Sequence, residues 1–418
     1  MQVLLKRKRL AIDKRLLTIL LIVFVQMVGT SMVNPILPLY AQSEFQMDAQ
    51  VITLLITVFF AAQFLAGPFI GRLSDQRGRL PILLISQIGT VIAFLMIGFA
   101  QSAAVLFFAR ALDGVTGGNI VVAQAYVTDI MPERRRTEAL GYTMAAFGLG
   151  FIVGPAVGGL LASLFGPHVP FLFAAAAALA TVLLTWLTLE ESLSAEDKAR
   201  NRGSGAAQLR PAELLRNAPL VAVMIVSFMS RFGMGLLIGA FALFAEAVIF
   251  RSHEFETISL GVGLMLMVVG LGQFVTQIFI LPAALKRLSD PPILLIGLVA
   301  RALSMFLLAM AIEPIIGTLS LAIFALGSGL FYPPLQSLLT KTVVSELRGA
   351  VLGLNQSVMN LGVILSTAAS GSLFALNPAL PNWLGGILYC LALIPAAFIW
   401  AWARGKGGVE RNRLAAAQ

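Results

Sequence analysis

Twelve apolar stretches separated by short polar segments are the feature that most constrains this chain of 418 residues. Each is long enough for a membrane-crossing helix, which needs about 20 apolar residues. With 58% hydrophobic and 12% charged residues, the composition excludes a soluble domain, for which roughly 45–50% and 25% are usual. The predicted spans are residues 16–40, 51–72, 80–100, 103–127, 139–165, 168–189, 218–246, 257–283, 291–311, 314–340, 349–376 and 383–403. We therefore expect an all-α membrane protein with twelve transmembrane helices.

The distribution of lysine and arginine predicts the orientation of these spans. Along alternate loops, 25 of the 29 Lys and Arg residues fall on one side of the membrane, and Arg251 alone falls on the other. An excess of positive charge marks cytoplasmic loops, so both termini are predicted to be cytoplasmic. The net charge of +9 then needs no nucleic acid to explain it. We expect an integral multi-pass protein of the cytoplasmic (inner) membrane whose first span is retained and not cleaved as a signal peptide.

A long polar segment divides the spans into six and six. We predict an N-terminal six-helix bundle at 1–189, a cytoplasmic linker at 190–217 and a C-terminal six-helix bundle at 218–418. Parallel repeats of this kind are one transporter construction, with the substrate site between the halves.

Internal repetition supports two pseudo-symmetric halves. A shift of 212 residues superimposes several glycines of the first half on glycines of the second, namely Gly117 on Gly329, Gly141 on Gly353, Gly150 on Gly362 and Gly159 on Gly371. Chance could supply one or two such matches, but a series at one register indicates a repeat.

Cysteine and histidine are too scarce for most cofactor chemistry. The single cysteine, Cys390, excludes a disulfide framework and a thiolate cluster, and two histidines make a histidine metal site improbable. There is no Gly-x-x-x-x-Gly-Lys loop for ATP and no combination of nucleophile, base and orienting residue. We expect no cofactor, no metal and no enzymatic activity.

The loop between the second and third spans, residues 71–79, reads GRLSDQRGR. Gly71 and Gly78 permit close backbone approach or a positive φ, while Asp75 and Arg79 can pair with neighbouring charges and helix ends. An ordinary basic loop would explain the arginines but not the spaced glycines.

This string resembles the Gly-X-Leu-X-Asp-X-X-Gly-Arg signature of the major facilitator superfamily, and twelve spans in two halves agree with that resemblance over essentially the whole chain. The resemblance implies a major facilitator fold and a gate at this loop. In such a gate Asp75 would meet the start of the eleventh span, and Arg79 would meet Asp129 at the cytoplasmic end of the fourth.

The fifth span contains a glycine-rich segment around Pro155. Gly150, Gly154 and Gly158 are four residues apart and form a smooth stripe on one helical face, while Pro155 can kink the helix. Helix packing alone would explain such a stripe. Together with Gly159, however, the segment resembles the fifth-span signature of the superfamily's drug:proton antiporters, which implies export.

Residues 108–191 resemble the tetracycline-exporter branch most closely, without establishing tetracycline as the substrate. In the fourth span, Arg110 and Asp113 share a helical face and must pair or face a cavity in hydrocarbon. The stretch resembles a family motif whose arginine is associated with proton movement, with Asp113 in place of glutamine. In the first span, Gln26 stands where an acid is common in this branch, so Asp113 is the acid that we place well inside the N-terminal half. We therefore predict proton coupling through Asp113 and Arg110. The alternative is that the two residues form a structural ion pair.

The resemblance implies a substrate cavity lined by the first, fourth, seventh and tenth spans. Their polar or aromatic candidates for substrate contact are Gln26, Asn34, Asn119, Gln124, Arg231, Tyr332 and Gln336. For each, hydrogen bonding between helices is the alternative. Arg231 is the sharpest candidate, because an unpaired cation near mid-membrane costs several kcal/mol. Arg301 in the ninth span is expected to pack or to snorkel.

We predict a secondary active transporter that exports a small lipophilic compound or drug by alternating access, coupled to protons. The alternative is an importer or lipid flippase of the same fold that recognises an anionic group through Arg231. The expected partners are a small-molecule substrate, protons and the lipid bilayer, with no nucleic acid. One chain contains both halves, so a monomer suffices.

Overall fold

The computed structural model describes residues 14–117, 119–194, 217–343 and 348–416. Within these ranges all regular structure is helical, and twelve segments are long and apolar enough to cross a membrane. The prediction of an all-α protein with twelve spans is confirmed.

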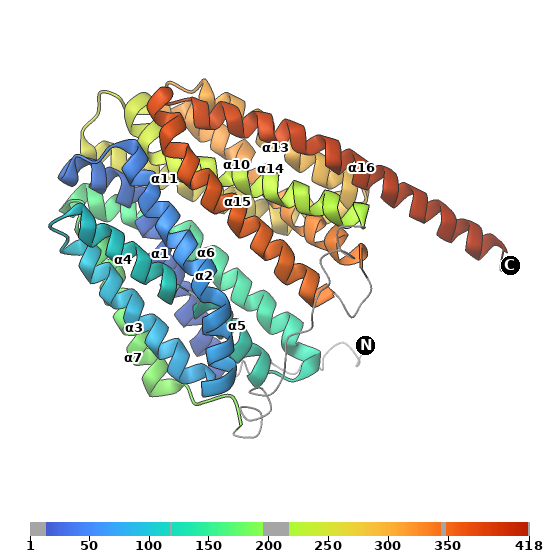
Figure 1. The fold of residues 1–418 in the computed structure, drawn as a ribbon, viewed down its shortest axis with the longest axis horizontal. Coiled ribbons are helices and arrows are strands. Elements are labelled where there is room, and N and C mark those ends of the chain that lie inside the picture. Colours follow the sequence, from blue (N-terminus) through green and yellow to red (C-terminus); the bar gives the residue numbers. More distant parts are fainter. Residues whose placement is uncertain (1–13, 118, 195–216, 344–347, 417–418) are drawn as a thin grey trace, which may run out of the picture.

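The helices form two groups that lie side by side (Figure 1). The first group comprises α1 (Lys14–Phe45), α2 (Ala49–Arg77), α3 (Arg79–Gly98), α4 (Ala103–Thr116), α5 (Asn119–Ile130), α6 (Glu133–Phe165) and α7 (Val169–Thr188). The second comprises α10 (Ala218–Phe244), η1 (Ala245–Ile249), α11 (Phe255–Val275), η2 (Thr276–Ile280), α12 (Leu281–Leu285), α13 (Asp290–Ala309), α14 (Pro314–Lys341), α15 (Arg348–Leu376) and α16 (Leu380–Ala416). Most of the predicted linker, residues 195–216, lies outside the described residues.

The fourth predicted span, 103–127, is confirmed as one candidate membrane span, Ala103–Ile130. It is divided into α4 and α5 at Gly117, whose N–H donates to the carbonyl of Gly114. The carbonyl of Gly117 accepts a hydrogen bond from Gln63 Nε2 of α2 at 3.1 Å. Glycine is a poor helix former, which fits a turn at this position. The break follows the Arg110–Asp113 segment directly.

The glycine stripe of α6 packs against α1. Cβ atoms added to Gly150, Gly154 and Gly158 would collide with Met27, Ser31 and Met32 of α1. Small residues thus allow the two helix backbones to approach closely.

The second half repeats this packing between α15 and α10. Gly362, the counterpart of Gly150, lies against the backbone of α10 at Phe228. The counterpart of Gly154 is Ser366, which packs against Gly235 of α10. In the first half the glycine is on α6 and the serine on α1, whereas in the second half the serine is on α15 and the glycine on α10. The close contact is the same, so the repeat in the sequence is also a repeat of helix packing.

In the described part of the chain, close contacts between the two bundles run from one end to about the middle of the helices, where Gly270 of α11 lies against Ile152 of α6. We call the end where α1 begins and α16 ends the proximal end, and the end where α1 ends and α2 begins the distal end. At the distal end, Thr57 Oγ1 of α2 donates to Thr367 Oγ1 of α15 at 3.0 Å, and Gly371 of α15 packs against Thr53 of α2. Gly159 of α6 packs there against the backbone of α11.

Toward the proximal end, the same helix faces have no close neighbour among the described residues at three glycine positions. Eighteen residues make about five helical turns, so two positions eighteen residues apart lie on the same face of a helix. We therefore compare each distal contact residue, Thr53 of α2, Gly159 of α6 and Gly371 of α15, with the position eighteen residues nearer the proximal end. These positions are Gly71, Gly141 and Gly353, and nothing lies within 4 Å of a Cβ atom built on any of them. Among the described residues, the bundles are therefore in contact at the distal end, whereas these three proximal positions face open space.

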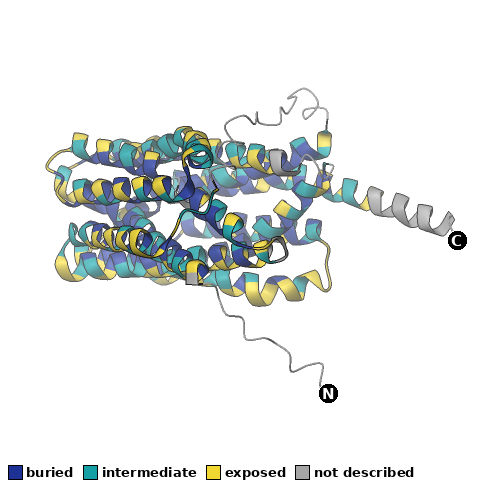
Figure 2. Cartoon of the chain, turned by 90° about the horizontal axis from the view of Figure 1, so that it is seen from below, coloured by how far each residue is buried: buried dark blue, intermediate teal, exposed yellow. Residues whose placement is uncertain are grey.

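The outer surface of both bundles is apolar. Figure 2 shows exposed residues along the outside of the helices and buried residues between them. Large apolar side chains are among the most exposed, including Phe69 at 72%, Leu187 at 70% and Ile315 at 79%. A surface of this kind fits a hydrocarbon environment, in which helices need no polar exterior.

Candidate functional site

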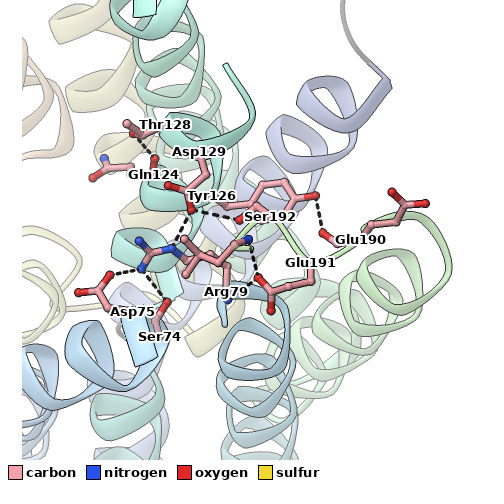
Figure 3. A network of polar contacts seen from close by, with 11 residues as sticks. Ser74, Asp75, Arg79, Gln124, Tyr126, Thr128, Asp129, Glu190, Glu191 and Ser192 are labelled. Carbon is pink, nitrogen blue, oxygen red and sulfur yellow. Dashed lines mark hydrogen bonds and ion pairs between the residues drawn. The ribbon is translucent and has the colours of Figure 1, made fainter. Parts of the chain in front are cut away.

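Arg79, at the start of α3, is the centre of a polar network at the proximal end of the first bundle (Figure 3). Its Nε donates to Asp129 Oδ2 at 2.9 Å, and its Nη1 donates to Asp75 Oδ1 at 2.5 Å and to Ser74 Oγ at 3.0 Å. The arginine is 8% exposed. These contacts join α2, α3 and the end of α5 through one planar guanidinium, whose fork of donors suits two carboxylates at once.

The two glycines of the loop have different roles. Gly78 adopts φ +115° between α2 and α3, a conformation that favours glycine. Gly71 instead lies inside α2 with open space beside it. The predicted contact of Asp75 with the start of the eleventh span lies outside the described side chains, because residues 344–350 are not described at that level.

The chain that follows α7 joins this network. Glu191 Oε1 accepts a hydrogen bond from the backbone N–H of Arg79 at 2.9 Å, and Ser192 Oγ donates to Asp129 Oδ2 at 3.1 Å. Glu191 thus lies at the N-terminus of α3, where a carboxylate is stabilised by the helix dipole. Sequence reasoning did not assign these residues to the gate; the pair of acids that ends the sixth span was the available signal.

Glu190 ties the same segment to the first helix. Its Oε2 accepts from Arg15 Nη2 at 2.7 Å, and its backbone carbonyl accepts from the hydroxyl of Tyr126 at 2.9 Å. The segment after α7 is therefore connected to α1, α3 and α5.

Arg110 and Asp113 form an ion pair inside the first bundle. Arg110 Nη1 lies 2.8 Å from Asp113 Oδ2, and the two residues are 1% and 2% exposed. The guanidinium also lies over the ring of Phe59 of α2, 4.2 Å from its centroid. The predicted shared face is thus present, and the pair is enclosed between α4 and α2.

The other candidates on the first, fourth and tenth spans lie in varied surroundings. Gln26 and Asn34 are half-buried on α1, and Gln336 is exposed on α14. Gln124 Nε2 lies 3.4 Å from Met144 Sδ of α6. The side chain of Asn119 lies outside the described part of the chain.

Arg231 and Tyr332 meet inside the second bundle. The guanidinium carbon of Arg231 lies 5.5 Å from the centroid of the Tyr332 ring, close enough for a cation–π contact. These two candidates, on α10 and α14, are therefore brought together.

Arg301 of α13 is fully buried beside them, at 0% exposure. Its Nη1 donates to Ser230 Oγ at 2.5 Å and its Nη2 to Tyr389 Oη at 2.8 Å. Of the two expectations for this residue, packing is found and snorkelling is wrong, because neighbouring side chains supply the hydrogen bonds that water would give. Sequence reasoning missed the cluster because its members come from four different helices.

Twelve candidate membrane spans in two bundles, with the Arg110–Asp113 ion pair inside one and the buried Arg301 inside the other, have the arrangement of a membrane transporter. A family model described as Major Facilitator Superfamily matches residues 19–249 and 223–416. The chain belongs to the Major Facilitator Superfamily, a family of transporters and not of enzymes.

Curated relatives match over nearly the whole chain. The tetracycline resistance protein, class C, of Escherichia coli is 29% identical over 397 residues, covering 94% of this chain and 98% of that protein. Multidrug resistance protein 2 of Bacillus subtilis is 26% identical, covering 89% and 91%. The expected resemblance to drug exporters is confirmed at this level.

Solved structures share the fold. The peptide transporter POT in complex with alafosfalin superimposes with a TM-score of 0.76 at 16% identity, covering 94% of each chain. The human organic anion transporter MFSD10 (TETRAN) gives a TM-score of 0.63 at 20% identity, covering 92% of this chain and 99% of that one. Among the described residues, no group of three His, Cys, Asp or Glu side chains could hold a metal ion.

Proposed function

We propose that the protein exports a small lipophilic compound across the cytoplasmic membrane by alternating access. The observation that carries the proposal is the one-sided opening, with contact at Thr57–Thr367 and open space at Gly71 and Gly353. By the positive-inside rule we expect the proximal end to lie in the cytoplasm. The opening would then face the cytoplasm, the side from which an exporter loads. The tetracycline and multidrug resistance relatives support a drug as the cargo.

The glycines at the two ends suit a rocking motion of the bundles. Gly159 and Gly371 allow close contact at the distal end, and Gly141 and Gly353 stand on the same faces at the proximal end. Small residues at both ends would let either end close while the other opens. The network around Arg79 would hold the proximal ends of α2, α3 and α5 as one unit during this motion.

Asp113 and Arg110 are the proposed proton-coupling pair. A proton on Asp113 cancels its charge and leaves Arg110 unpaired in an enclosed, apolar site. An unpaired buried charge is strongly destabilising, so protonation would favour a rearranged bundle. This is the physical link that proton antiport requires between a proton and a conformation.

The test is proton movement in inside-out vesicles that carry the protein, followed with a pH-gradient dye while lipophilic cations, tetracyclines and macrolides are added. One compound class should dissipate the gradient, and Asp113→Asn should abolish this response. Asp48→Asn, which changes an exposed acid between α1 and α2, is the matched control. Because Asp113→Asn leaves Arg110 unpaired, the double variant Arg110→Gln/Asp113→Asn checks that a loss does not reflect misfolding. Proton-linked export that survives in Asp113→Asn would remove this residue from the mechanism.

An importer or lipid flippase of the same fold is the second candidate. It is favoured by Arg231, whose buried Nε has no hydrogen-bond partner in the described structure. Accumulation in right-side-out and in inside-out vesicles distinguishes the directions of transport. One chain contains both bundles, so we expect either function to need only a monomer.

A further inference from the structure

Two arginines share one tyrosine inside the second bundle. The guanidinium carbons of Arg231 and Arg301 lie 5.5 Å and 5.6 Å from the centroid of the Tyr332 ring. The two cations are therefore no farther apart than the sum of these distances. Like charges this close in a medium of low dielectric repel each other.

No acid in the described part of the chain compensates these charges. Asp290 is paired with Lys341 at the proximal end. Glu246 lies fifteen residues after Arg231, about 22 Å along the helix, and its Oε2 has no hydrogen-bond partner. The first bundle differs, because its buried arginine, Arg110, has Asp113 as a counter-ion.

Arg301 is held as a fixed charge. Besides its bonds to Ser230 and Tyr389, its guanidinium lies 5.0 Å from the ring centroids of both Phe324 and Phe331. Rings and hydroxyls on several sides leave this side chain no freedom to reach water. It contributes positive potential without moving.

Arg231 and Tyr332 form the accessible side of the cluster. Both are only half-buried, yet Nε of Arg231 is a buried atom without a hydrogen-bond partner in the described structure. α10, which carries Arg231, contacts α1 and α2 of the other bundle, so the residue lies on a helix at the boundary between the bundles. An unpartnered buried donor of this kind calls for an acceptor.

We propose that Arg231, Arg301 and Tyr332 bind an anionic group, a carboxylate, sulfonate or phosphate, on an amphipathic ligand. The guanidinium of Arg231 would donate to the anion, the hydroxyl of Tyr332 would donate beside it, and Arg301 would act through its field. Charge-assisted bonds from arginine to such groups are strong and directional. Binding of the anion does not depend on the proposed function. The statement that the bound anion is the transported compound does rest on it. It narrows the cargo from any lipophilic compound to organic anions and zwitterions.

The experiment measures binding to the purified full chain in phosphatidylcholine nanodiscs by titration calorimetry. The probes are aromatic carboxylates, sulfonates and phosphates, each paired with its neutral amide or ester. At least one acid should bind about tenfold or more tightly than its neutral partner, a difference of about 1.4 kcal/mol. Arg231→Gln should abolish that preference, and Tyr332→Phe should reduce it. Arg251→Gln, which changes an exposed loop arginine, should retain it.

Two results would overturn the proposal: no acid preferred over its neutral partner, or a preference that persists in Arg231→Gln. Thermal unfolding of each variant confirms that the folded chain is being titrated. Nanodiscs with an equal share of phosphatidylglycerol separate the two sources of the anion. If phosphatidylglycerol weakens binding of the acid, and this effect is lost in Arg231→Gln, the site binds a lipid headgroup. If phosphatidylglycerol does not weaken binding of the acid, the site binds a free organic anion. The binding measurement needs no proton gradient and no transport. A protein that does not export with protons can therefore still show the anion preference, and the two proposals are tested separately.

Discussion

Gly159 of α6 and Gly263 of α11 lie back to back where the two bundles meet. A Cβ built on Gly159 would stand 3.2 Å from the Cα of Gly263, and one built on Gly263 would stand 3.1 Å from the Cα of Gly159. Neither helix can therefore accept a larger residue here without moving. The contact lies at the distal end, so a larger residue here should hold the two bundles apart at that end.

We expect Gly159→Val to weaken distal closure. Overpacking of a tight contact costs about 1–3 kcal/mol, and moving the bundles apart relieves it. Ser259, which is fully buried against Gly159, provides the measurement as Ser259→Cys in a chain that also carries Cys390→Ser. A membrane-impermeant maleimide applied from the distal side should label this cysteine faster in the valine variant. Gly148→Val, which faces open space, is the control and should leave labelling unchanged; equal labelling in all three proteins would contradict the prediction.

Cross-links at the two ends of one helix pair should report opposite states. Thr57 and Thr367 are in contact through their hydroxyls, so Thr57→Cys/Thr367→Cys should oxidise readily and arrest export until a reductant is added. Gly71 and Gly353 each stand fourteen residues nearer the proximal end than Thr57 and Thr367, on the same two helices. Both glycines face open space. Gly71→Cys/Gly353→Cys should cross-link only during turnover, when the proximal end closes. Both pairs are made in a Cys390→Ser background and scored by gel mobility after cleavage between the bundles; a proximal cross-link that forms equally without substrate would argue against rocking.

The residues explain which parts of this structure the sequence could predict. Spans were predictable because twenty apolar residues in a row are a local signal. The Arg110–Asp113 pair was predictable because residues three apart share a helical face. The Arg79–Asp129 contact came only from the family resemblance, since it joins helices fifty residues apart. The cluster around Arg301 was not predictable, because it depends on how four helices are rotated about their axes.

Gly78→Ala should destabilise the protein, because φ +115° is unfavourable for any residue with a Cβ. We expect a loss of about 1–3 kcal/mol, seen as a lower temperature of thermal unfolding in detergent. Gly71→Ala is the matched control, since that glycine is helical and has open space beside it. Alanine there should be neutral or stabilising by up to about 1 kcal/mol. Equal effects at the two positions would show that backbone conformation is not the cause.

Arg79→Ala should destabilise the proximal network more than any exposed arginine of the same loop. It leaves Asp129, whose side chain is 20% exposed, without its guanidinium partner, and removal of one member of a mostly buried pair costs about 3 kcal/mol. Thermal unfolding and export should both fall, whereas Arg77→Ala, at an exposed position of α2, should change little. Arg79→Lys should recover only part of the loss, because an ammonium group cannot bond Asp75 and Asp129 with a planar fork.

The double variant Arg79→Ala/Asp129→Asn separates lost attraction from an uncompensated charge. If the unpaired carboxylate of Asp129 causes the damage, neutralising it should restore part of the stability lost in Arg79→Ala, so that the double variant is more stable than the sum of the single changes predicts. Strict additivity would instead mean that Arg79 and Asp129 contribute independently. In that case the loss in Arg79→Ala would come from the contacts of the guanidinium with Ser74 and Asp75.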